Sequence, residues 1–295
     1  MGHAPGLSAT RRATADPGSC HPCGMDRLKD RVCLVTGSTG IAAASARRFA
    51  AEGAAVFVVS RSAKHARALA GELETAGGRV AWAAGDLTVE ADVDRSVAAA
   101  VERFGRIDGL FAVAGASGRR FGDGPIHELT ADGWDRTLAI NLRSQALTCR
   151  AVIRQMLAQP PNGSGTRGSV LLMGSVTATD PVPAFFATHA YAAAKGATNA
   201  LMTTMAAAYA PNGIRVNAVA PSVTDTPMAT RAASDARIRA FNARKQPLAG
   251  EMLDPDEVAH AAIYFLSDES RVVTGQLLKI DGGWSVLSVS PESPE

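Results

Sequence analysis

Cysteine, aromatic side chains, net charge and long apolar runs are all scarce in this sequence of 295 residues. Its four cysteines are too few for a disulfide framework in a chain of this length, so we expect a reducing, cytoplasmic location. The formal net charge of +2 is too small to indicate nucleic acid or an anionic membrane as a partner. No apolar run approaches the roughly 18 residues that a transmembrane helix needs, so we expect no membrane insertion.

The first residues differ in composition from the rest of the chain. Residues 1–24 are rich in Gly, Pro, Ser, Thr and Arg and have no apolar period, which predicts a disordered tail rather than a secretory signal. Cys20 and Cys23 lie in this tail without a second Cys/His pair at zinc-finger spacing, so we expect no metal site. We predict one domain over residues 25–285 and a C-terminal tail over 286–295, and Met25 is an alternative start to Met1.

From Arg31 onward, short continuous apolar runs alternate with longer helical patterns. The predicted strands are 32–35, 55–59, 79–84, 109–113, 169–173, 214–219 and 276–280. The predicted helices are 41–51, 63–75, 91–104, 131–157, 191–209 and 256–266. Such strands are typical of a parallel sheet that is covered on both faces. We therefore predict an α/β fold: a single doubly wound Rossmann-like domain with a parallel seven-stranded sheet flanked by helices.

A glycine turn follows the first predicted strand. It contains Gly37, Ser38, Thr39, Gly40 and Ile41. In a doubly wound sheet, ligands bind outside the carboxyl ends of the strands. Glycines allow a tight turn and close approach of a pyrophosphate, and the following helix offers its amide end to the anion. Glycine turns also join strands to helices in many other folds, so this turn indicates a dinucleotide site only together with further residues.

The ends of the second and third strands carry polar residues. Ser60 and Arg61 follow the second strand, where an arginine accommodates the 2′-phosphate of NADP and an acid would bind the 2′-hydroxyl of NAD. The alternative is that Arg61 opens the next helix in solvent. Asp86 and Leu87 follow the third strand, and Asp86 either approaches the adenine end of a dinucleotide or caps the helix that starts near Glu90.

The ends of the remaining strands complete a set of candidate ligand contacts. Ala114 and Gly115 follow the fourth strand with small side chains, as expected where a flat ligand approaches the backbone. Ser175 follows the fifth strand. Three further candidates follow the sixth strand or end it: Pro221, Val223 and Thr226.

Tyr191 and Lys195 are four positions apart in a predicted helix and therefore lie on one face of it. A free tyrosine has a pKa near ~10, which makes it a poor base at neutral pH. A cation within about 4–6 Å favours the phenolate and lowers that pKa by roughly 1–3 units. The pair thus indicates proton exchange with an alcohol or carbonyl, provided that other residues converge on it.

From about Lys29 to Trp284 the chain resembles the compact, single-domain short-chain dehydrogenase/reductase family. The resemblance rests on Tyr191-Ala-Ala-Ala-Lys195, Ser175, Asn141 within Ile140-Asn141-Leu142, and the blocks at 213–221 and 274–284. It implies that Tyr191 is the general acid/base and that Ser175 holds the substrate oxygen. It further implies that Lys195 lowers the tyrosine pKa and binds the nicotinamide ribose. Asn141 would fix a water that relays protons to Lys195.

The resemblance also implies a hydride transfer between a nicotinamide dinucleotide and a small-molecule secondary alcohol or ketone. Arg61 favours NADP(H), and an NAD(H)-preferring enzyme or a non-catalytic dinucleotide-binding sensor or scaffold are the alternatives. The family favours a homodimer or homotetramer that uses the long helix 131–157 and the helix of Tyr191. We expect no nucleic acid, membrane or metal partner.

The chain departs from the family pattern at several positions. The glycine loop is one residue shorter than usual, Ala42 stands at the third glycine, and Ser222 replaces the usual glycine after Pro221. Residues 112–115 lack the family's asparagines, so a polar contact between the central strands is expected to be made otherwise. The lid segment 226–247 contains several cations, including Arg231, which can meet anions. The other residues that we considered near the substrate, each with a purely structural alternative, are Arg119, Arg120, Trp134, Phe185, Phe186 and His189.

Overall fold

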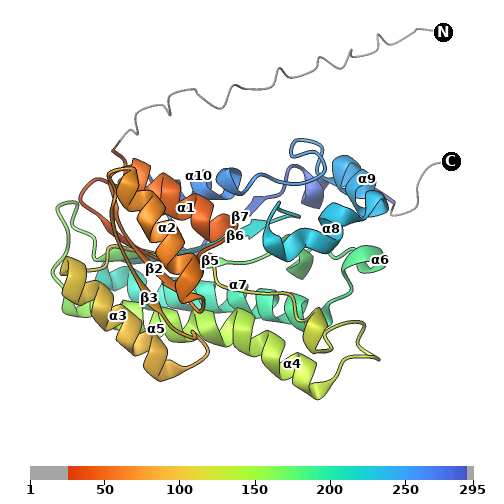
Figure 1. Ribbon diagram of the computed structural model, residues 1–295, viewed down its shortest axis with the longest axis horizontal. Helices are drawn as coiled ribbons and strands as arrows, with labels where there is room; N and C mark the ends of the chain where they lie inside the picture. The colour runs from red at the N-terminus through yellow and green to blue at the C-terminus, as the bar shows by residue number, and fades with distance from the viewer. Residues whose placement is uncertain (1–25, 291–295) are drawn as a thin grey trace, which may run out of the picture.

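The computed structural model describes residues 26–290 and has the predicted parallel sheet (Figure 1). The strands are β1 (Val32–Thr36), β2 (Ala55–Ser60), β3 (Arg79–Ala84), β4 (Gly109–Ala112), β5 (Gly168–Met173), β6 (Ile214–Pro221) and β7 (Leu277–Ile280). They pair in parallel in the order β3-β2-β1-β4-β5-β6-β7. The predicted fold class is therefore confirmed, whereas the tail 1–24 and its two cysteines lie outside the described residues.

Helices cover both faces of the sheet. They are α1 (Ile41–Ala51), α2 (Ala63–Thr75), α3 (Glu90–Phe104), α4 (Ala131–Leu138), α5 (Ser144–Ala158), α6 (Pro183–Phe186), α7 (His189–Tyr209), α8 (Thr230–Ser234), α9 (Ala236–Lys245) and α10 (Pro255–Leu266). Figure 1 shows α1, α2 and α10 on one side of the sheet and α3, α5 and α7 on the other.

The central strands are buried on both faces because each supplies side chains to two separate cores. In β1, Cys33 and Val35 belong to the core under α1 and α10, whereas Leu34 belongs to the core under α3, α5 and α7. Successive side chains of a strand point to opposite faces, which explains why the sequence shows continuous rather than alternating apolar runs. The order of the strands reverses between β1 and β4, so a ligand crevice is expected at their carboxyl ends.

The long helix predicted at 131–157 is interrupted. A π-helical turn at Ala139–Arg143 separates α4 from α5, and it contains Asn141. Each π-turn inserts an extra residue into the helix, and such turns are frequent at functional sites. The backbone stays helical throughout 131–158, so the predicted helix is present, and only the π-turn within it was not predicted, because a π-turn has no clear signature in the apolar period.

Three short helices lie where the sequence predicted none: α6 lies between Ser175 and Tyr191, and α8 and α9 lie in the lid segment 226–247. Pro183 stands at the first position of α6, where a proline costs no hydrogen bond. Asp235 caps α9 by accepting hydrogen bonds from the amides of Arg237 and Ile238. Figure 1 shows α6, α8 and α9 at one end of the molecule.

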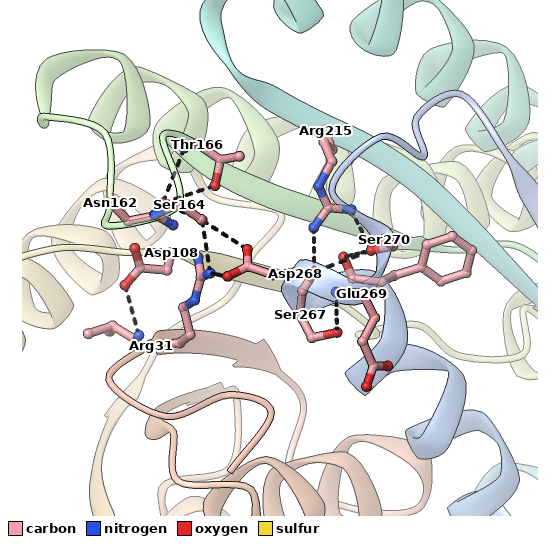
Figure 2. Close-up of polar contacts among 12 residues, drawn as sticks. Arg31, Asp108, Asn162, Ser164, Thr166, Arg215, Ser267, Asp268, Glu269 and Ser270 are labelled. Atoms are coloured by element: carbon pink, nitrogen blue, oxygen red, sulfur yellow. Dashed lines mark hydrogen bonds and ion pairs between the residues drawn. The ribbon is translucent and has the colours of Figure 1, made fainter. Parts of the chain in front are cut away.

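The amino ends of the central strands are joined by a polar cluster at the opposite edge from the crevice (Figure 2). Arg31, before β1, forms a 2.5 Å ion pair with Asp268, and Ser164 donates a hydrogen bond to the same carboxylate. Arg215 of β6 donates to the Ser270 hydroxyl at 2.7 Å and to the Ser267 carbonyl at 3.0 Å. These contacts connect the loops that precede the strands to the end of α10.

Within residues 26–290, no helix is both long and apolar enough to span a bilayer.

Candidate active site

A cavity of about 330 Å³ opens at the carboxyl ends of β1, β4, β5 and β6. All four catalytic candidates line it: Asn141, Ser175, Tyr191 and Lys195. The predicted cofactor contacts that line the same cavity are Gly37, Thr39, Gly40, Ile41, Ala114, Gly115, Pro221, Val223 and Thr226. The remaining candidates, Ser38, Ser60, Arg61, Asp86 and Leu87, lie outside it, at the ends of β1, β2 and β3.

The glycine turn keeps its left-handed backbone although it is one residue short. Gly37 has φ +100° and Gly40 has φ +53°, which favours glycine at both positions. A Cβ at Gly40 would lie 2.8 Å from Cγ2 of Thr226, so the turn packs directly on the segment after β6. No side chain caps α1, so its first amides face the cavity. These features fit a dinucleotide pyrophosphate, which binds such amide ends.

Thr36 replaces the polar contact that the missing asparagines would have made. Its hydroxyl accepts a hydrogen bond from the Ala114 amide at 2.9 Å and thereby joins the ends of β1 and β4. Ala114 and Gly115 then run along the cavity with no bulky side chain. The sequence indicated that this contact would be made otherwise, and the structure identifies Thr36 as the residue that makes it.

Asn141 is fully buried, and its side chain holds the chain segment that follows β4. Its amide donates to the carbonyls of Ala116 at 2.9 Å and Thr137 at 3.0 Å, and its side-chain oxygen accepts the Ala116 amide at 3.1 Å. Its role in fixing a relay water stays a prediction. What the structure shows is a residue that shapes the wall of the cavity.

Tyr191 and Lys195 lie on one face of α7, as the spacing predicts. Lys195 is 1% exposed, and its Nζ donates to the Met173 carbonyl at the end of β5, at 2.8 Å, while lying 5.5 Å from the centre of the Tyr191 ring. Ser175 follows the same strand, and its hydroxyl lies 2.9 Å from that of Thr177 and is hydrogen-bonded with the Tyr191 hydroxyl. The side chains of Ser175, just after β5, and of Tyr191 and Lys195, on α7, thus meet in the same part of the cavity.

Burial acts on the two titratable groups in opposite directions. It raises the pKa of Tyr191 to about 12, against a smaller lowering by the Ser175 hydrogen bond. It lowers the pKa of Lys195 to about 7. The expectation that Lys195 depresses the tyrosine pKa is therefore not met in the protein alone. The reason is that burial disfavours both charged forms, so the lysine offers the phenolate less positive charge than an exposed ammonium would.

Gln145 is a buried residue that the sequence analysis missed. Its Nε2 donates to the Asn141 carbonyl at 2.8 Å and to the Met173 carbonyl at 3.2 Å, and its Oε1 accepts the Met173 amide at 3.0 Å. The Met173 carbonyl also accepts from Lys195, so Gln145 connects the lysine to the π-turn of Asn141. Its position four residues after Asn141 is the signal that could have identified it, because the two share a helix face.

Asp123 is a second residue that sequence reasoning missed. It is 4% exposed, and its carboxylate accepts hydrogen bonds from the amides of Ala190 and Tyr191, at 3.0 and 3.1 Å. These are amides of the first turn of α7, whose adjacent residue Thr188 makes no side-chain cap. Asp123 therefore caps the helix that carries Tyr191 from a distant segment. No local pattern predicts a cap of this kind.

The ends of β2 and β3 form the region in which we expect the adenosine half of a dinucleotide. The Ser38 hydroxyl donates to that of Ser60 at 2.8 Å, which joins the glycine turn to β2. Arg61 is exposed, and its guanidinium has no hydrogen bond or ion pair with any residue in 26–290. Asp86 accepts from the Thr88 amide and hydroxyl, so its carboxylate shapes the turn before α3. Leu87 is buried in the core.

The other end of the cavity is aromatic and basic. Phe186 and Trp284 line it, with ring centres 5.9 Å apart, and both belong to a cluster that also includes Phe185 and Phe241. Trp284 is fully buried, and its indole donates to the Asp180 carbonyl. No sequence pattern placed Trp284 in the substrate wall.

Arg119 and Arg231 also line this end, whereas four of the residues considered near the substrate do not. Phe185 packs in the aromatic cluster behind the cavity wall. Arg120 is exposed and lies over the ring of Phe121. Trp134, on α4, is 37% exposed and outside the cavity. His189 is exposed at the first position of α7.

Known proteins share this architecture along most of the chain. A family model described as enoyl-(acyl carrier protein) reductase matches residues 35–285. Cis-4-hydroxycyclohexanecarboxylate dehydrogenase of Sinomonas cyclohexanicum is 37% identical over 264 residues, which are 89% of this chain and 99% of that protein. A-factor type gamma-butyrolactone 1′-reductase (1S-forming) of Streptomyces virginiae is 37% identical over 266 residues, which are 88% of this chain and 97% of that protein.

A solved structure agrees with these relatives. The 3-ketoacyl-(acyl-carrier-protein) reductase from Brucella melitensis, complexed with NADH, superposes with a TM-score of 0.75 at 30% identity, over 88% of this chain and 100% of that one. Together with the glycine turn and the group formed by Ser175, Tyr191 and Lys195, these matches lead to one conclusion. The chain belongs to the short-chain dehydrogenase/reductase family, and it is an oxidoreductase that acts on CH–OH groups, with a fold that binds NAD(H) or NADP(H).

Proposed function

We propose that this protein transfers a hydride between NADP(H) and a small-molecule secondary alcohol or ketone, with Tyr191 as general acid/base. The observation that carries the proposal is the meeting of Ser175, Tyr191 and Lys195 in the cavity that also contains the glycine turn. The names of the two relatives, a cis-4-hydroxycyclohexanecarboxylate dehydrogenase and a gamma-butyrolactone 1′-reductase, support an alcohol or ketone substrate.

The bound dinucleotide would supply the hydride acceptor or donor, the nicotinamide, and the protein would supply placement and proton transfer. In the direction of ketone reduction, the Ser175 hydroxyl holds the substrate oxygen, and the Tyr191 hydroxyl donates its proton to that oxygen. A pKa of about 12 keeps Tyr191 protonated at neutral pH, as this direction requires. In the direction of alcohol oxidation, Tyr191 would act as the phenolate: it first loses its own proton and then takes the proton of the substrate hydroxyl, and a pKa of about 12 makes this form the minor one at neutral pH.

The other residues hold the reacting groups in place. Lys195 would bind the nicotinamide ribose from its position on the Met173 carbonyl, and the relay water of Asn141 belongs to the same proposal. The amide end of α1, together with Gly37 and Gly40, would hold the pyrophosphate. Ala114, Gly115, Pro221, Val223 and Thr226 would contact the nicotinamide half, since they line the cavity between the turn and Tyr191.

The preference for NADP(H) rests on Arg61. Its exposed guanidinium has no partner within residues 26–290, and it directly follows Ser60 at the end of β2, where the 2′-position of a bound dinucleotide is expected. An NAD(H)-preferring enzyme is the second candidate, favoured by the NADH that is bound to the Brucella reductase. The non-catalytic sensor was suggested by the shortened glycine loop and the missing asparagines, but Gly37 and Gly40 keep positive φ and Thr36 makes the contact between β1 and the turn after β4.

The substitution Tyr191→Phe tests the proposed role of Tyr191, because it removes the hydroxyl and leaves the ring. We expect turnover of secondary alcohols and ketones to fall by at least about 1,000-fold, because the proton-transferring oxygen is lost. The dissociation constant for the dinucleotide should change less than about threefold. Steady-state kinetics and fluorescence titration measure the two quantities, and Tyr209→Phe, at the far end of α7, is the matched control. Turnover close to that of the parent protein would refute the role of Tyr191.

We further propose a cytoplasmic homodimer or homotetramer. The two described cysteines, Cys33 and Cys149, are free and buried, which supports a reducing compartment. A hollow lined by residues of α5 and α7 supports an assembly through these helices, and Leu157, one of its lining residues, is 41% exposed.

A further inference from the structure

The mouth of the cavity contains two arginines that come from segments far apart in the sequence. Arg119 lies in the 3-10 turn after β4, and Arg231 lies in α8. Both donate to one acceptor, the Phe185 carbonyl of α6, at 3.3 Å and 2.6 Å. The two guanidinium groups are therefore close neighbours at the wall of the site.

Neither cation is neutralised by the protein around it. No carboxylate within residues 26–290 forms an ion pair with Arg119 or Arg231. Asp123 is the acid whose negative charge raises the pKa of Arg119. Both of its carboxylate oxygens already accept hydrogen bonds, from the amides of Ala190 and Tyr191. Burial, and then the charge of Arg231, lower the pKa of Arg119, which means that the two like charges destabilise each other. Both arginines are exposed, so water solvates their charges in the protein alone, and an anionic ligand group can take the place of that water.

The remaining wall determines how a ligand would lie. Ser175 and Tyr191 bind the reacting oxygen, and Phe186 and Trp284 line the same cavity with apolar surface. Arg231 also lies over the ring of Phe186, at 5.7 Å, which holds its guanidinium at the edge of this apolar wall. The cavity wall thus has a polar part at Ser175 and Tyr191, an apolar part at Phe186 and Trp284, and a cationic part at the two arginines.

We propose that the substrate carries an anionic group, of the carboxylate type, which Arg119 and Arg231 bind together while the reacting carbon lies at Tyr191. This inference rests on the proposed function and specifies its substrate class. Paired guanidinium groups suit a carboxylate, because each offers several N–H donors in a fixed plane. The phosphates of the dinucleotide are the other anions near this site, but their expected contacts are the glycine turn, α1 and Arg61. Arg119 and Arg231 instead contact Phe185, in the segment between Ser175 and Tyr191.

The test compares 4-oxocyclohexanecarboxylate with its methyl ester, which has the same ring and ketone but no charge. Binding is measured by calorimetry on protein saturated with NADP⁺, with which a ketone cannot react. We expect the parent protein to bind the acid about 10- to 100-fold more tightly than the ester, the range for hydrogen bonds to charged groups. The double variant Arg119→Met/Arg231→Met should lose this preference, with the ester changed less than about threefold.

Arg120→Met is the matched control, because Arg120 is adjacent and exposed but lies outside the cavity. It should keep the preference for the acid. The double variant should also bind NADP⁺ as the parent does. If it weakens NADP⁺ about tenfold and leaves acid binding unchanged, the pair serves the dinucleotide and the inference is wrong. Equal binding of acid and ester by the parent, or no binding of the acid, overturns it as well.

Two further measurements keep the inference separate from the proposed function. Acid binding by the parent should weaken as salt rises from low to physiological concentration and ester binding should not, a result that does not depend on the variant folding. Turnover with NADPH is then measured for both ketones. A parent that binds the acid through the pair but reduces neither ketone would refute the function alone, whereas one that reduces the ester as efficiently as the acid would refute the inference alone.

Discussion

At the scale of single residues, the site contains groups whose ordinary charges are disfavoured by burial. Tyr191 and Lys195 both shift toward their neutral forms, and the lysine is held by a carbonyl rather than by an acid. Spacing alone suggested an electrostatic effect of the lysine on the tyrosine. In the protein alone the pKa of Tyr191 shifts upward instead, because desolvation of the phenolate outweighs any attraction to a lysine that is itself shifted toward its neutral form.

Arg61 is the residue that should decide between the two dinucleotides. Arg61→Ala is expected to weaken NADPH binding by about 10- to 100-fold, since a charge-assisted hydrogen bond to the 2′-phosphate is lost. NADH binding should change less than about twofold, because that cofactor has no phosphate at this position. Fluorescence titration at one fixed salt concentration measures both constants.

The control for Arg61 is Arg103→Ala, which removes an exposed positive charge on α3. It should leave both constants unchanged. If Arg61→Ala weakens NADPH and NADH equally, the reason for preferring NADP(H) disappears. Tighter binding of NADH than of NADPH by the parent protein would have the same consequence.

At the scale of elements, the reactive residues are placed by contacts between segments that are distant in the sequence. Asp123 caps α7, Gln145 joins the π-turn to the end of β5, and Thr36 joins β1 to the turn after β4. Each contact satisfies backbone groups near the cavity that would otherwise be buried without a partner, which is costly. The positions of the reactive side chains therefore depend on these three hydrogen-bonding residues as well as on the helix that carries Tyr191.

Asp123 offers a direct test of this support. Asp123→Ala should lower the free energy of unfolding by about 1–2 kcal/mol, the usual cost of a lost cap. It should also lower kcat by about tenfold or more, because the first turn of α7 positions the Tyr191 hydroxyl. The dissociation constant for the dinucleotide should stay nearly constant. Chemical denaturation, steady-state kinetics and fluorescence titration measure the three quantities.

Asp254→Ala is the matched control for Asp123, because Asp254 caps α10 through the Asp256 amide, away from the cavity. It should reduce stability without reducing kcat. If both variants leave kcat unchanged, the cap of α7 is structural only, and the positioning role of Asp123 is wrong.

At the scale of the whole molecule, the amino ends and the carboxyl ends of the strands have different roles. At the amino ends of the strands, Arg31 and Ser164 both bond to Asp268, and Arg215 bonds separately to Ser270 (Figure 2). Burial raises the pKa of Asp268, but hydrogen bonds from Arg31 and Ser164 outweigh it and lower that pKa overall. The carboxyl edge has the cavity instead.

The proposed assembly is tested at this scale too. Leu157→Glu together with Met205→Glu places charges in the hollow between α5 and α7 and is expected to convert the oligomer into a monomer. Light scattering measures the mass. Val89→Glu, at a residue that is 46% exposed against 41% for Leu157, should leave the mass unchanged. A parent protein that is already monomeric would contradict the assembly.

The amino-acid sequence by itself determined the parallel sheet, the glycine turn and the cluster of strand-end residues around Tyr191. These follow from local rules: apolar runs, chain reversals, and the meeting of strand ends at one edge of a parallel sheet. The Tyr191–Lys195 pair followed from the helical repeat.

Only the tertiary structure decided how those residues are supported and charged. Asp123, Trp284 and the pairing of Arg119 with Arg231 depend on segments that are far apart in the chain, and no local pattern encodes such contacts. The π-turn at Asn141 and the opposite pKa shifts of Tyr191 and Lys195 have the same origin. Hydrogen-bond partners and desolvation are properties of the packed molecule, because they arise only when distant segments exclude water from one another.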